Sequence, residues 1–276
     1  MTYEEIQQLN PRQFKRFCGV SRDTFEFMVS VLKTHLDRMG KRGGRSKLSV
    51  EDHLLITLEY WREYRTQFHI AQSWGIHEAT VCRIVRKVEE YLIRSGAFSL
   101  PGKRQILQCE QPWDVVVVDV SETPIERFKK KQRRYYSGKK RSHTLKMQLV
   151  IDQLTGLILC TFFGLGRTHD FRVFKASQVR FAQSQMCLAD KGCQGLDKRH
   201  SHICTPIKKR RKQKRSPEER THNRLLARLR VVVEHANRRL KIFRILSERY
   251  RNRRKRFGLR VNLIAGLLNH ELSLKS

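Results

Sequence analysis

Four acidic residues stand out in this basic chain because of the segments that contain them. Asp119 follows four consecutive valines in VVVVDVSETP, Asp190 ends the apolar run MCLAD, Asp170 lies in RTHD, and Glu234 lies in RLRVVVEHANRRLKIF. Carboxylate oxygens are the ligands that Mg²⁺ prefers. Two divalent ions held by three carboxylates can activate a hydroxyl or water for in-line displacement at phosphorus. These residue types therefore indicate metal-dependent phosphoryl chemistry.

Each acid also has a simpler interpretation. Asp119 can close a strand and begin the SETP turn, since Asp is common in turns. Asp170 is typical of a helix N-terminus, and it remains the alternative to Asp190 as the second acid. At roughly 100° per residue, Arg230 lies about 40° and Lys241 about 20° from Glu234 on one helical stripe. That stripe would be either a metal and phosphate site or a solvated salt-bridge face, and we expect it to lie opposite an apolar stripe at positions 225, 229, 232 and 243.

The elements that would position these acids form a mixed α/β domain over residues 112–276. Short β-rich runs predict strands at 115–120, 145–152, 157–163, 186–190 and 202–206. A helix is expected over 170–181. A long helix begins at SPEE, where Ser216 is the N-cap, Pro217 the first helical residue and Glu219 the third. An apolar helix over 259–272 closes the chain.

The first part of the chain, residues 1–103, predicts an all-α domain. Apolar periodicity indicates helices over 21–36, 49–64, 67–73 and 77–93. The last two meet at the glycine turn Trp74-Gly75-Ile76, which is the pattern of a helix-turn-helix at about 67–93. Its outward side chains, which would read DNA base edges, are His77, Glu78, Thr80, Arg83, Arg86 and Lys87. A purely structural helical domain is the alternative.

Charge favours a polyanionic partner. The chain carries 58 Lys and Arg against 26 Asp and Glu, a net charge of +32, which favours nucleic acid. Double-stranded DNA is the first candidate, RNA the weaker one. No run approaches the ~20 apolar residues of a spanning helix, and the N-terminus lacks a secretory signal, so we expect a soluble, cytoplasmic protein with no membrane partner.

Seven cysteines without a C-x-x-C do not resemble a disulfide framework. The nearest zinc candidates, Cys187, Cys193, His202 and Cys204, match no closed-site spacing, and small buried thiols are the alternative. The basic stretches 208–215 and 249–256 would bind the DNA backbone. The loop KKKQRRYYSGKK would add Lys139 and Lys140, with Tyr135 and Tyr136 as stacking rings. A solvated hairpin is the other interpretation of this loop.

Four segments in the second part of the chain together resemble the DDE-class transposases of bacterial insertion sequences, in the branch related to Harbinger transposases. In chain order, these segments are VVVVDVSETPIERFKKKQRRYYSGKKRSHTLKMQLVIDQLTG, ADKGCQG, TPIKK and RLRVVVEHANRRLKIFRIL. The resemblance covers nearly the whole chain. It implies a helix-turn-helix domain followed by a ribonuclease H-like mixed-sheet domain, an α+β or α/β class. It also implies that Asp119, Asp190 and Glu234 are the catalytic acids.

The same resemblance implies how such a protein acts. The acids would hold two Mg²⁺ ions, with Mn²⁺ able to substitute, and Arg230 and Lys241 would grip phosphates. The substrates would be the terminal inverted repeats of an insertion sequence and target DNA, with paired ends favouring a homodimer or higher assembly. The alternatives are a domesticated DDE nuclease, which cuts without joining, and a non-catalytic DNA-binding protein derived from a transposase.

Overall fold

The computed structural model describes residues 2–37, 47–108, 113–190, 192, 200, 202–209, 215–252 and 254–275. The chain forms two compact units. The helical unit comprises Met1–Ser99, Leu240–Glu248 and Leu259–Ser276, and the sheet unit comprises Leu100–Arg239 and Arg249–Gly258. This division differs from the expected one at residues 1–103 and 112–276, because two segments from the end of the chain belong to the helical unit.

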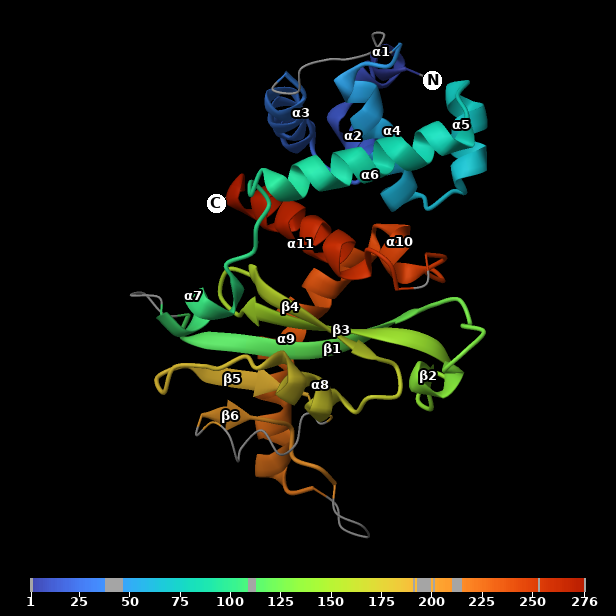
Figure 1. The fold of residues 1–276 in the computed structure, drawn as a ribbon. Helices are drawn as coiled ribbons and strands as arrows, with labels where there is room; N and C mark the ends of the chain where they lie inside the picture. The colour runs from blue at the N-terminus through green and yellow to red at the C-terminus, as the bar shows by residue number, and fades with distance from the viewer. Residues whose placement is uncertain are drawn as a thin grey trace. The chain divides into compact units, whose positions relative to one another are not determined.

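The sheet unit contains a mixed sheet with β1 (Val115–Pro124) at its centre (Figure 1). On one side, β1 pairs antiparallel with β3 (Ser142–Asp152), and β3 pairs antiparallel with β4 (Ile158–Leu165). The short β2 (Tyr136–Ser137) also pairs with the start of β3. On its other side, β1 pairs parallel with β5 (Met186–Ala189), and β5 pairs parallel with β6 (Ile203–Cys204). Three antiparallel strands followed by two parallel ones form a ribonuclease H-like sheet.

Helices cover both faces of this sheet. Val116 and Val118 pack with α7 (Gly102–Gln108) and α8 (Asp170–Ser177) in one buried cluster. Residues of the opposite parity on β1 face α9 (Pro217–Lys241), because alternate side chains of a strand point to opposite faces. The predicted capping box at Ser216 and Glu219 is confirmed by reciprocal hydrogen bonds of 3.1 Å. Helix α8 ends earlier than expected, with Gln178 in the left-handed conformation.

The helical unit contains the predicted helices and several that periodicity did not reveal. The expected ones are α3 (Arg22–Asp37), α4 (Val50–Arg62), α5 (Gln67–Trp74), α6 (Glu78–Arg94) and α11 (Phe257–Ser273). The others are short: α1 (Tyr3–Gln7), α2 (Pro11–Cys18) and α10 (Arg244–Ser247). No helix in the described part of the chain is long and apolar enough to cross a membrane.

Candidate catalytic and DNA-binding sites

The parallel register of β1 and β5 brings two of the predicted acids together. Val117 pairs with Leu188 and Val118 with Ala189, so the next residues along each strand are Asp119 and Asp190. Asp190 follows the end of β5, whereas Asp119 lies in the middle of β1, directly after its parallel pairing with β5 ends. The strand continues past Asp119 through the SETP segment, which was expected to be a turn. The two valines and their partners are fully buried, which anchors the backbone that carries the carboxylates.

Helix α9 contributes two donors to these acids. The Arg230 guanidinium lies between the carboxylates, with Nη1 at 3.3 Å from Asp190 Oδ1 and Nη2 at 3.9 Å from Asp119 Oδ1. About two turns further along the helix, Asn237 Nδ2 donates a 2.9 Å hydrogen bond to Asp119 Oδ2. Arg230 and Asn237 are about 20° apart around a helix with roughly 100° per residue. Both acids are therefore contacted from one face of α9.

The electrostatic environment of Asp119 is dominated by burial. Burial raises the pKa of Asp119 above its ordinary value, because removal from water disfavours the ionised carboxylate. The Arg230 charge and the hydrogen bond from Asn237 lower this pKa in part, whereas the neighbouring Asp190 charge raises it. A bound cation would favour the ionised form further.

The donor set suits a hard divalent cation. The carboxylates of Asp119 and Asp190, carried by adjacent strands, share the Arg230 guanidinium between them. Carboxylate oxygens are ligands that Mg²⁺ and Mn²⁺ bind. Within the described ranges, no group of three His, Cys, Asp or Glu side chains is arranged to hold an ion, so the third acid stands apart.

Glu234 is that third acid. It lies on α9 between Arg230 and Asn237, about 40° from the former, and its side chain is exposed to solvent. It forms no hydrogen bond or ion pair with the described residues. Glu234 therefore lies beside the face of α9 that contacts Asp119. No hydrogen bond or ion pair with a described residue holds the Glu234 side chain in place, so it can rotate.

One expectation about α9 is wrong. Leu225 and Leu229 were expected on its buried stripe, but they are 54% and 39% exposed. The helix packs instead through Leu226, Val233, Ala236 and Leu240, all of which are buried. The face with Arg230 and Asn237 adjoins this buried stripe. The adjoining position explains how polar side chains reach a buried strand.

Asp170 lies on the opposite face of the sheet from Asp119. Its carboxylate pairs with Lys146 Nζ at 2.5 Å, and Lys146 is 3.6 Å from Glu122 Oε1. Glu122 is three residues from Asp119 on β1 and therefore points to the other face. The side chains of Lys146 and Glu122 are only 8% and 7% exposed. Asp170 at the start of α8 thus belongs to a buried ion-pair cluster, separate from Asp119 and Asp190.

The predicted helix-turn-helix consists of α5, a turn and α6. Gly75 ends α5 in the left-handed conformation, with φ of 60°, and His77 caps α6 by accepting from the Ala79 amide at 3.1 Å. Val81, Ile84, Val85 and Val88 of α6 are buried. The outward candidates of α6 are exposed, except for the half-buried Thr80: they are His77, Glu78, Arg83, Arg86 and Lys87.

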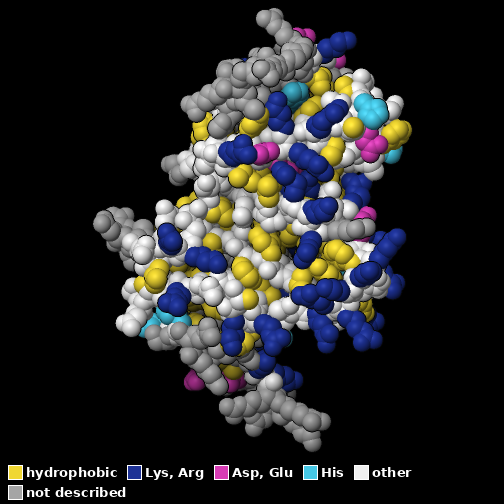
Figure 2. All heavy atoms as spheres, viewed as in Figure 1, with side chains coloured by type: hydrophobic (Ala, Val, Ile, Leu, Met, Phe, Trp, Pro, Cys, Tyr) yellow, Lys and Arg dark blue, Asp and Glu magenta, His cyan; other side chains and the backbone are white. Residues whose placement is uncertain are grey.

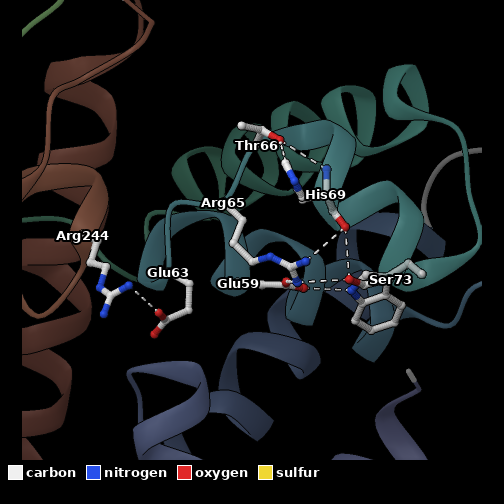
Figure 3. A network of polar contacts seen from close by, with 8 residues as sticks. Glu59, Glu63, Arg65, Thr66, His69, Ser73 and Arg244 are labelled. Atoms are coloured by element: carbon white, nitrogen blue, oxygen red, sulfur yellow. Dashed lines mark hydrogen bonds and ion pairs between the residues drawn. The ribbon is translucent and has the colours of Figure 1, made fainter.

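A buried glutamate, Glu59, holds together α4, the loop that follows it and α5 (Figure 3). Glu59 of α4 accepts a 2.7 Å bond from Arg65 and a 2.9 Å bond from the Trp74 indole nitrogen. Arg65 also donates to Ser73 of α5 at 3.0 Å. These contacts tie α4 to the loop before α5 and to the C-terminal end of α5. Since α5 and α6 are joined by a short turn, the same contacts also help to position α6.

Other predicted DNA contacts have mixed outcomes. Tyr135 is buried and stacks on Phe128 with ring centroids 4.2 Å apart, so the expectation that it offers a free stacking ring is wrong. Tyr136 is 45% exposed, and Lys139 and Lys140 are exposed beside it. Lys241 is the exposed last residue of α9 and belongs to the helical unit.

Two groups of predictions lie partly outside the described residues. In the zinc candidate set, Cys187 is buried and Cys204 half-buried, while Cys193 is not described. The basic stretch 208–215 is likewise described only at residues 208, 209 and 215. Figure 2 shows Lys and Arg side chains spread widely over the visible face, with few Asp and Glu among them, as the net charge predicts.

Comparison with known families agrees with the two-part organisation of the chain. The model of the DDE superfamily endonuclease family matches residues 118–269, and that of the helix-turn-helix of DDE superfamily endonucleases matches residues 46–98. The chain belongs to the DDE superfamily of endonucleases, enzymes that generally use divalent metal ions. Within it, the chain is of the bacterial insertion-sequence transposase type.

Two relatives support this assignment. The chain is 53% identical to the probable transposase for insertion sequence element IS702 of Microchaete diplosiphon, over all 276 residues of both chains. It is 25% identical to the candidate transposase for insertion sequence element IS112 of Streptomyces albus G, over 88% of this chain and 89% of the relative. No solved structure matches the chain.

Proposed function

We propose that this transposase cleaves DNA at the ends of its insertion sequence and joins the resulting 3′-hydroxyl to target DNA. The observation that supports this proposal best is the pair of carboxylates on the adjacent strands β1 and β5, with Arg230 and Asn237 of α9 directed at them. In the first reaction, water attacks the phosphodiester at the element's end, and the bond to the 3′-oxygen breaks. In the second, that 3′-oxygen attacks a target phosphodiester and releases a target 3′-hydroxyl.

Asp119, Asp190 and Glu234 would hold two Mg²⁺ ions, for which Mn²⁺ would substitute. Bound ions of this kind polarise the attacking and leaving oxygens of an in-line displacement. Asp119 and Asp190 are already neighbours, and Glu234 would join them by rotation of its exposed side chain. Both reactions transfer phosphorus between oxygens directly, so no nucleophilic Ser, Tyr or Cys is required.

The remaining predicted residues would bind DNA. Arg230 and Lys241 would contact phosphates beside the cleaved bond, and Lys139, Lys140 and Tyr136 would contact the strand near the site. The α6 residues would read base edges in the terminal inverted repeats: they are His77, Thr80, Arg83, Arg86 and Lys87. Simultaneous binding of two element ends favours a homodimer or higher assembly, acting on DNA in the bacterial cytoplasm.

The test is an assay of cleavage and strand transfer on a supercoiled plasmid that carries the element's own ends, with Mg²⁺. Asp119→Asn, Asp190→Asn and Glu234→Gln should each abolish both reactions and retain DNA binding. Asp170→Asn is the matched control, because it makes the same change on the other face of the sheet and should leave both reactions in place.

Three results would contradict the proposal. Full activity of Asp119→Asn would show that this carboxylate holds no catalytic ion. Cleavage by the wild type without joining would identify a nuclease. DNA binding without either reaction would identify a non-catalytic DNA-binding protein.

A further inference from the structure

Asn237 is a polar residue of the sheet unit to which the reaction described above assigns no role. Its Nδ2 atom donates to Asp119 Oδ2 at 2.9 Å. An ionised carboxylate only accepts hydrogen bonds, so the amide nitrogen faces Asp119 and Oδ1 points away from it. That Oδ1 atom is buried and has no partner among the residues that the structure describes. A buried acceptor without a partner costs free energy, which a purely structural asparagine would avoid.

The two donors of α9 divide the oxygens of Asp119 between them. Arg230 lies nearer Oδ1, at 3.9 Å, and also contacts Asp190. Asn237 holds Oδ2. A divalent cation at the two carboxylates would compete with Arg230, because both are positively charged and seek the same oxygens. The neutral amide of Asn237 does not compete in this way and can keep its hydrogen bond.

We propose that Asn237 is a positioning residue for Asp119: its hydrogen bond fixes Oδ2, so that Oδ1 is turned toward Arg230 and Asp190. This inference rests on the proposed function, since it assumes that the two aspartates bind a divalent ion. Partners that orient metal ligands in this way typically affect metal affinity by roughly 10–100-fold.

The test measures the affinity of the full-length protein for Mn²⁺, by calorimetry or by electron paramagnetic resonance, alongside thermal unfolding. Asn237→Leu keeps the approximate size of the side chain and removes both polar atoms. Asn223→Leu is the matched control, because Asn223 lies on the same helix and bonds the backbone N and O of Ile207 at 2.8 and 3.2 Å, away from the acids. Asn237→Ala serves as a second variant if the larger apolar side chain impairs folding.

Asn237→Leu is expected to weaken Mn²⁺ binding by about tenfold or more, whereas Asn223→Leu leaves it unchanged. A merely structural Asn237 would lower the unfolding temperature without changing Mn²⁺ affinity, and that result would overturn the inference. Asp119→Asn separates this failure from a failure of the proposed function. If it weakens Mn²⁺ binding while the Asn237 variants do not, only the positioning role is refuted. If Asp119→Asn also leaves Mn²⁺ affinity unchanged, the metal site itself is refuted.

Discussion

Replacement of Arg260 by methionine should destabilise the helical unit strongly, because it leaves a buried carboxylate without its cation. Arg260 of α11 donates from Nε to Glu89 Oε1 of α6 at 2.6 Å, and the Trp61 indole nitrogen donates to the same oxygen at 3.1 Å. The Glu89 side chain is fully buried and that of Arg260 is 4% exposed. Through this pair, the last helix of the chain holds the helix that carries the predicted base-reading residues.

The magnitude follows from that burial. Removing one partner of a buried ion pair costs about 3–5 kcal/mol, because the remaining charge has lost its hydration and its counter-charge. A neutral hydrogen bond such as that from Trp61 contributes only about 1 kcal/mol and does not offset this loss. Arg94→Met is the matched control. It breaks the pair between Arg94 and Glu90 on α6, whose side chains are 66% and 51% exposed, and should cost under about 0.5 kcal/mol.

The assay is urea denaturation followed by tryptophan fluorescence, with the free energy of unfolding compared at an unchanged denaturant slope. A double variant, Glu89→Leu with Arg260→Met, should lose less than the sum of the two single variants, because it removes both charges together. The reasoning is refuted if Arg260→Met is as mild as Arg94→Met, or if the two losses at Glu89 and Arg260 simply add.

Three further predictions concern packing, pH and DNA. Gly266→Ala should destabilise the protein in thermal unfolding, although alanine favours helix by about 1 kcal/mol, because its Cβ would lie 1.9 Å from the Phe98 carbonyl oxygen; a stabilised variant would contradict this. Cleavage at limiting Mg²⁺ should fall as pH drops through a pKa above the ordinary carboxyl value, because protonated Asp119 cannot hold a cation. Arg230→Gln removes a charge that lowers this pKa, so the acidic limb of the pH–rate profile should move to higher pH, and an unmoved limb would count against Asp119. Arg83→Ala should reduce discrimination between terminal-repeat and unrelated DNA by about 1–3 kcal/mol in fluorescence anisotropy; equal losses on both would indicate a backbone contact.

The elements were largely predictable from the sequence because their signals are local. Apolar runs bounded by turns marked the five main strands, and the capping box at Ser216 marked the start of α9. The glycine between α5 and α6 marked the helix-turn-helix, whose family model matches residues 46–98. Asp190 follows β5 as predicted, whereas Asp119, expected near a strand end, lies in the middle of β1, because the SETP segment continues the pairing with β3. Each of these features depends on residues within one element and its caps, so one stretch of sequence suffices to predict it.

The long-range arrangement was decided by tertiary structure. Only the register of β1 with β5 brings Asp119 beside Asp190, and only strand parity places Asp170 on the other face with Lys146. The spacing of seven residues between Arg230 and Asn237 indicates that they share one face of a helix. It does not reveal that Asn237 contacts the Asp119 carboxylate.

Exposure and domain membership depended on packing in the same way. The exposure of Leu229 depends on which stripe of α9 packs against the rest of the protein. Tyr135 is buried where its ring stacks on that of Phe128. Helix α11 belongs to the helical unit, where its Arg260 pairs with the buried Glu89, a residue 171 positions away that sequence spacing does not reveal. Periodicity shows that a helix has an apolar face, whereas the partner of that face is set by the competition of all the elements for burial.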